Sequence, residues 1–123
     1  MSQEHKKFKL FTKDFSSQES LKQLLKEIEK WVADEKVAPK SIGVEYLEKS
    51  KHIVMSIGYQ DDNGYKVQLS SELVSKIDLN ADYSQIEKSM AEAASKHENI
   101  ICHELFITDS GDFHMVFMVK VAG

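Results

Sequence analysis

The chain has 123 residues, of which 41% are hydrophobic and 29% charged, and it predicts one globular domain, 1–123, that needs no metal or disulfide to bury a core. Its formal charge of −4 argues against a nucleic-acid-binding protein, whose affinity depends on neutralising phosphates. The single cysteine, Cys102, excludes an internal disulfide and is typical of a reducing compartment. The N-terminus lacks the apolar core of a signal peptide, and no run reaches membrane-span length. We therefore expect a cytoplasmic protein with no cofactor and with no nucleic-acid or membrane partner.

The chain begins with a strand and a helix. Residues 6–12, KKFKLFT, partly alternate polar and apolar side chains and predict a strand with Phe8 and Leu10 on its inner face. A helix should begin near Ser16, and Pro39 should mark its exit because proline denies the backbone a donor. The apolar stripe of this helix has a period of about 3.6 residues and consists of Leu21, Leu24, Leu25, Ile28, Trp31 and Val32.

Three strands follow the first helix. They are expected at 42–48, 52–60 and 65–70, where apolar residues again alternate. DDNG at 61–64 predicts a tight hairpin between the last two strands, with Gly64 free to take a positive φ. That hairpin would set two pairs of side chains opposite each other, Tyr59 with Val67 and Ile57 with Leu69.

The second half of the chain is less regular at its start. The pattern of residues 71–82 is the least informative in the chain, and it is compatible with either a helical turn or an irregular covering segment. Asn80 or Asp82 can cap a second helix, whose apolar stripe is Tyr83, Ile86, Met90, Ala93 and Ala94. Two last strands are expected at 100–108 and 112–121.

Short segments of the two halves resemble each other: HIVM at 52–55 and HMVF at 114–117, and VEYL at 44–47 and HELF at 103–106. Tight turns in the two hairpins would place Leu47 opposite His52 and Phe106 opposite His114. The same pairs then superpose in both halves, which favours an internal repeat.

The repeat defines the predicted fold. We expect an α+β domain in which two βαββ repeats, about 5–60 and 65–122, form a mostly antiparallel six-stranded sheet with two helices packed on one face. In element order this arrangement resembles the tandem strand-helix-strand-strand architecture of the GyrI-like effector-binding domains. The likeness implies a fold and no particular activity.

The sheet face without helices is then the candidate functional surface, because it mixes polar and apolar side chains. Its central carboxylate is Glu104, with Glu45 as its counterpart in the first repeat. Beside apolar neighbours, a carboxylate can bind a cationic or amphipathic small ligand. The alternative for Glu104 is a half-exposed strand residue bonded to a lysine or histidine across the sheet. The predicted ligand-binding residues are Glu104, Glu45, His114, His52, Phe106 and Met118.

Metal binding and nucleophilic catalysis find less support. Alternation sends His103 to the opposite face from Cys102 and His114, and the latter two are too far apart along the strands for a closed metal site. We therefore expect no metal. The chain has no phosphate-cradling glycine loop, HExxH or paired CxxC motif.

Three functions stay open. The first is a small, soluble, non-enzymatic domain that binds a small-molecule ligand on the uncovered sheet face. The second is a protein-interaction module, with a second copy of the chain as partner in a homodimer. The third is an enzyme that uses Glu104 with His114.

Overall fold

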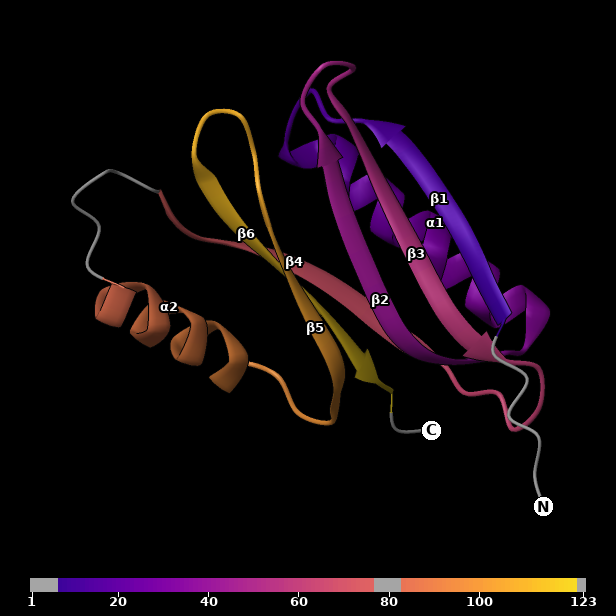
Figure 1. Ribbon diagram of the computed structural model, residues 1–123. Coiled ribbons are helices and arrows are strands. Elements are labelled where there is room, and N and C mark those ends of the chain that lie inside the picture. Colours follow the sequence, from indigo (N-terminus) through magenta and orange to yellow (C-terminus); the bar gives the residue numbers. More distant parts are fainter. Residues whose placement is uncertain (1–6, 77–82, 122–123) are drawn as a thin grey trace.

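The computed structural model describes residues 7–76 and 83–121 (Figure 1). In chain order the elements are β1 (Lys7–Asp14), α1 (Gln18–Glu35), β2 (Ala38–Leu47), β3 (His52–Gln60), β4 (Val67–Lys76), α2 (Tyr83–Ser95), β5 (Ile100–Ile107) and β6 (Asp112–Lys120). The strands form two antiparallel sheets, sheet 1 in the order β1-β3-β2 and sheet 2 in the order β4-β6-β5. The predicted α+β class is therefore confirmed.

The described residues form two three-stranded sheets rather than one six-stranded sheet, because the chain changes sheets after β3. β4 pairs with β6 and not with β3, so the hairpin predicted around DDNG is wrong, as are its pairs Tyr59–Val67 and Ile57–Leu69. The connection instead passes the end of α1, where the Tyr65 N–H donates to the Val37 carbonyl. β4 is also longer than expected, since it takes in residues 71–76.

The turn after β3 uses its glycine for space rather than for a positive φ. Asn63 is the residue in the left-handed region, with φ 58°. Gly64 lies against the C-terminal end of α1, where a Cβ would overlap the carbonyl oxygen of Lys36. Any larger residue at 64 would push the connection away from the helix.

α1 forms where its apolar period predicts. Its N-cap is Ser17, one residue after the expected position, and the N–H groups of Ser16 and Ser17 donate to the Ser20 hydroxyl at 3.2 and 3.3 Å. The helix ends at Lys36, which takes φ 54°. Pro39 does not mark this end but lies buried within β2, next to a register shift in its pairing with β3.

α1 packs between parts of both sheets and makes the main core. Its buried stripe, Leu21, Leu24, Leu25, Ile28 and Val32, follows the predicted period, and Trp31 is half-buried beside it. Sheet 1 contributes Ile53, Met55 and Ile57 to this core. Sheet 2 contributes Val67, Leu69, Phe106, Val116 and Met118.

α2 packs on the opposite face of sheet 2. Ala93, with Met90 and Ala94 beside it, contacts Met115 and Phe117, which alternate along β6 with the residues that face α1. The helices therefore do not share one face of a sheet, as was expected; Figure 1 shows α1 behind sheet 1 and α2 apart from it. Tyr83 belongs to the predicted stripe yet is 70% exposed, and the predicted caps Asn80 and Asp82 lie outside the described residues.

The registers predicted for the β2–β3 and β5–β6 hairpins are confirmed. Leu47 pairs with His52 and Phe106 pairs with His114. The tips of the two hairpins meet, because Asp109 bonds both Lys51 and the hydroxyl of Tyr46. The element order strand, helix, strand, strand thus occurs twice, while descent of the two halves from one duplicated sequence stays a prediction.

Candidate functional site

The six predicted ligand-binding residues do not form one exposed surface. Phe106, His114 and Met118 are only 5%, 2% and 1% exposed, because α1 covers their face of sheet 2. Glu45 and His52 lie on the face of sheet 1 that points away from α1, as their register with Val54 and Leu47 requires. Alternation grouped the residues within each hairpin correctly, and it puts Glu104, which pairs with Val116, on the same face as Phe106 and His114. The prediction that one uncovered face carries all six is not met, because the residues of sheet 2 face α1 and those of sheet 1 face away from it.

The buried part of the predicted site is an aromatic cluster around His114. Its ring stacks on Phe106 with centroids 5.0 Å apart, and Phe15 meets it edge-on at 5.7 Å. Burial lowers the pKa of His114, an effect that the nearby Asp112 carboxylate opposes. The Nδ1 atom is buried and has no hydrogen-bond partner among the described residues. His114 is therefore a neutral core residue at pH 7, and its Nδ1 does not bond Glu104.

Cys102 is not an activated thiol. Burial, and to a lesser degree the Glu104 carboxylate, raise its pKa to about 11, against a smaller lowering by the Ile42 backbone amide. A thiol with this pKa stays protonated at neutral pH and is a poor nucleophile. Among residues 7–76 and 83–121, no three histidine, cysteine or acidic side chains come together as a metal site.

The outward face of sheet 1 is the first surface with functional character, and we call it the open face. Register places Phe8, Leu10, Thr12 and Asp14 of β1, Ser41, Gly43, Glu45 and Leu47 of β2, and His52, Val54, Ser56 and Gly58 of β3 on it. Phe8 and Leu10 are 66% and 67% exposed. The charged groups gather at one end, where His52 pairs with Asp14 at 2.6 Å.

β1 exposes these two apolar side chains because it turns a third one inward. Phe11 pairs with Met55 and faces α1, where its ring meets Trp31 edge-on at 5.6 Å. Phe8 and Leu10 then point outward by alternation, so their predicted inward placement is wrong. The strand carries apolar residues on both faces, and only the position of α1 decides between them.

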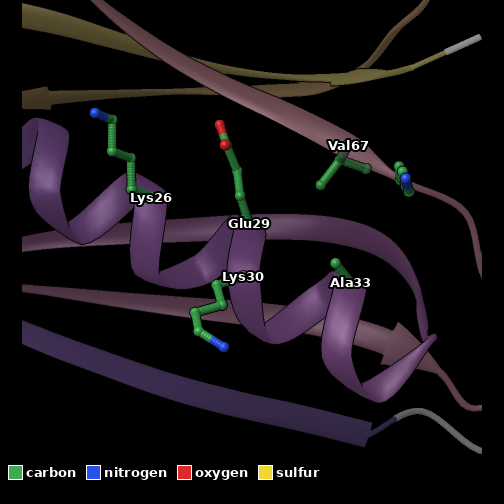
Figure 2. Close-up of a pocket in the computed structure, with 6 residues that line it drawn as sticks. Lys26, Glu29, Lys30, Ala33 and Val67 are labelled. Carbon is green, nitrogen blue, oxygen red and sulfur yellow. The ribbon is translucent and has the colours of Figure 1, made fainter.

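A basic groove between α1 and β4 is the second such surface (Figure 2). Two adjoining hollows of about 350 and 290 Å3 form it. Its lining residues include Lys22, Lys26, Glu29, Lys30 and Lys66, with Val67, Gln68, Leu69, Ser70 and Ser71 from β4. Lys22, Lys26 and Lys30 lie away from the apolar stripe of α1 and by themselves read as a solvent-exposed helix face. The spacing of 22, 26 and 30 by four residues marks one helix edge, but nothing in the sequence places β4 against it.

One hydrogen bond fixes the floor of the groove. The Glu29 carboxylate accepts from the backbone N–H of Leu69 at 2.7 Å, and Figure 2 shows Glu29 reaching from α1 toward the strand that carries Val67. β4 is an edge strand of sheet 2, and Leu69 offers this donor on its free edge. Glu29 therefore occupies a position that a neighbouring strand would otherwise use.

Comparisons of the chain with family models, with curated proteins and with solved structures found no match. The similarity in element order to the GyrI-like effector-binding domains therefore gives no basis for assigning a function to this chain. In the part of the chain that the structure describes, neither helix has the length and apolar character to cross a membrane. Among the described residues, the open face and the basic groove are the two surfaces whose composition suggests binding.

Proposed function

We propose that the protein is an interaction module that forms a homodimer through the open face of sheet 1. The observation that carries this proposal is the outward placement of Phe8 and Leu10, each about two-thirds exposed on a sheet face that no described helix covers. Gly58 has no side chain and the neighbouring Ser41 has a small one, so the sheet surface next to the Phe8 ring is flat. A flat face that exposes Phe8 and Leu10, with its acidic residues Asp14 and Glu45 displaced toward one end, suits packing against a second sheet.

The uneven distribution of charge along the open face supports pairing with a second copy. Its acidic residues, Asp14 and Glu45, lie toward the end that carries Leu47, while Phe8 lies at the other end. In a two-fold arrangement with the strands of the two copies running in opposite directions, each acidic end stands over the apolar end of its partner. Like charges are then kept apart, and the apolar side chains of both copies are covered.

The expected affinity is modest. Full burial of a phenylalanine or leucine side chain contributes about 1.5–3 kcal/mol, and a two-fold interface buries Phe8 and Leu10 twice. Since both are already partly covered, these four side chains together contribute on the order of 4–8 kcal/mol. Association costs are of similar size, so the net affinity must come from the other groups that the interface buries, among them Leu47 and Val54 of each copy. The face of three strands measures roughly 14 by 27 Å, which is small for a stable dimer. We expect a dissociation constant on the order of 1–100 µM.

The small cationic ligand and the enzyme have less support. Both need Glu104 and His114 to act at a surface, and His114 is buried in the core with a neutral ring. Of the six predicted ligand-binding residues, only Glu45 and His52 lie on the open face, and His52 is already paired with Asp14.

Analytical ultracentrifugation over a concentration series up to about 200 µM tests the proposal. The wild type should pass from monomer to dimer, and the double variant Phe8→Ser/Leu10→Ser should weaken dimerisation by at least about 30-fold, because four buried side chains are lost. Ile107→Ser is the matched control, since Ile107 is a 45% exposed strand residue of sheet 2. A wild type that stays monomeric, or a double variant that dimerises as the wild type does, would overturn the proposal.

A further inference from the structure

We propose a second binding site in this protein: the basic groove between α1 and β4 binds an extended acidic peptide. The site lies apart from the open face, because α1 covers the opposite face of sheet 1. Binding in the groove therefore requires no dimer.

The charge of the groove contrasts with that of the chain. The formal net charge is −4, yet the groove is lined by Lys22, Lys26, Lys30 and Lys66, with Glu29 as the acidic lining residue. Lys30 bonds Asp34 at 2.6 Å and points away from Val67 in Figure 2. The other three lysines form no ion pair with any described residue, so their charges are left for a partner.

The spacing of the lysines suits a peptide in extended conformation. Lys22 and Lys26 are four residues apart, which is about 6 Å along a helix. Alternate side chains of an extended chain recur every 6.4–6.8 Å or so. Acidic residues at alternate positions of a peptide can therefore meet the two lysines in turn, and the helix tolerates two neighbouring like charges that repel each other in the free protein.

The edge of β4 supplies the contacts that a peptide backbone needs. Leu69 directs its N–H to the free edge, where the Glu29 carboxylate accepts it, so the groove already holds one carboxylate of the kind we propose as ligand. Ser71 lines the same hollow, and its buried Oγ has no hydrogen-bond partner among the described residues. A backbone donor on a sheet edge that only a side chain occupies is what a strand added to that edge would engage.

The shape of the groove favours a peptide over a small anion. The two hollows share Lys26 and Glu29 and follow α1 from Lys22 to Ala33. Eleven residue steps along a helix span about 16 Å, which corresponds to about five residues of an extended chain. A single phosphate or carboxylate would leave most of this length empty.

Fluorescence anisotropy with a labelled peptide of about ten residues, in which glutamate alternates with threonine, tests the site. The wild type should bind with a dissociation constant on the order of 10–500 µM at low salt, and the same peptide with glutamine for glutamate should not bind. Lys22→Gln/Lys26→Gln should weaken binding by at least about tenfold. Lys49→Gln/Lys88→Gln changes the net charge equally at exposed positions outside the groove, and it should bind within about twofold of the wild type.

Glu29→Gln separates a binding site from a merely basic surface. Glutamine keeps an oxygen that can accept the Leu69 N–H but lacks the charge that repels an acidic peptide, so binding should tighten by about threefold to tenfold. Unchanged or weaker binding by this variant, equal losses in the two lysine pairs, or tighter binding of a single-stranded oligonucleotide through the same lysines would each overturn the proposal. Phe8→Ser/Leu10→Ser should bind the peptide as the wild type does, which keeps this test independent of the dimer.

Discussion

Sheets 1 and 2 share their element order and hairpin register but differ in what covers them. Sheet 1 packs one face on α1, and no helix of the described residues covers its other face, whereas sheet 2 lies between α1 and α2. His52 and His114 occupy matching positions opposite Leu47 and Phe106, yet one histidine is partly exposed and the other is buried. The same local pattern therefore contributes differently to stability in the two sheets, because a helix buries the position in sheet 2 and leaves it partly exposed in sheet 1.

The comparison of Phe106 with Leu47 should show the largest difference. Phe106→Ala should lower the free energy of unfolding by about 3–5 kcal/mol, because it empties a core position beside Phe15 and His114. Leu47→Ala, at the matching position of the open face, should change it by less than about 1 kcal/mol. Chemical denaturation at a protein concentration below the dissociation constant of the dimer measures both free energies. Equal losses would show that the open face is covered in the folded chain.

The matching valines should repeat the contrast on a smaller scale. Val116 is fully buried against α1, so Val116→Ala should cost about 2 kcal/mol of unfolding free energy. Val54 lies at the centre of the open face and is only partly covered, so Val54→Ala should cost about half as much or less. If the open face is the dimer contact, Val54→Ala should lower the unfolding free energy by more when the same denaturation experiment is repeated at high protein concentration.

His114 should make stability depend on pH. Burial lowers its folded-state pKa below the usual 6.5, so between these two pKa values the unfolded chain binds a proton that the folded chain does not. The full stability is therefore present above about pH 6.5 and is lost as the pH falls toward the folded-state pKa. Melting temperatures recorded from about pH 7.5 to 5.5 should decline, and His114→Phe should flatten the decline.

His103 is the matched control for this titration because it is an exposed histidine on the neighbouring strand. His103→Gln should leave the contribution of His114 in place. A wild-type slope that survives in His114→Phe would show that other groups cause the decline.

The sequence was sufficient for elements whose apolar residues lie on one side. The stripe of α1 and the registers of the β2–β3 and β5–β6 hairpins follow directly from period and turn length. It was insufficient for β1, where Phe8, Leu10 and Phe11 place apolar groups on both faces, and for β4, where no periodic signal shows that residues 71–76 continue the strand. Both depend on contacts between segments far apart in the chain.

The candidate sites were harder to predict than the fold for a related reason. Alternation correctly grouped Phe106, His114 and Met118 on one face, but the helix that covers this face comes from the other half of the chain. The basic groove likewise joins α1 to β4 across the change of sheet. A pattern within one element states which side chains share a face, and only the packing of the elements determines whether that face is surface or core.

Thiol reactivity provides the finest test of the contrast between the two sheets. Cys102 lies on the covered side of sheet 2 with a pKa of about 11, so its thiolate fraction at pH 8 is about 0.001. Its reaction with Ellman's reagent should be on the order of 100-fold slower in the folded protein than in denaturant, where an ordinary thiol pKa returns.

Ser41→Cys in a Cys102→Ser background puts a thiol on the open face instead, and this thiol should react at nearly the unfolded rate in dilute protein. Its reaction should slow as the concentration rises through the dimer range, because the partner's open face then covers it; a rate independent of concentration would contradict the open face as the contact between copies.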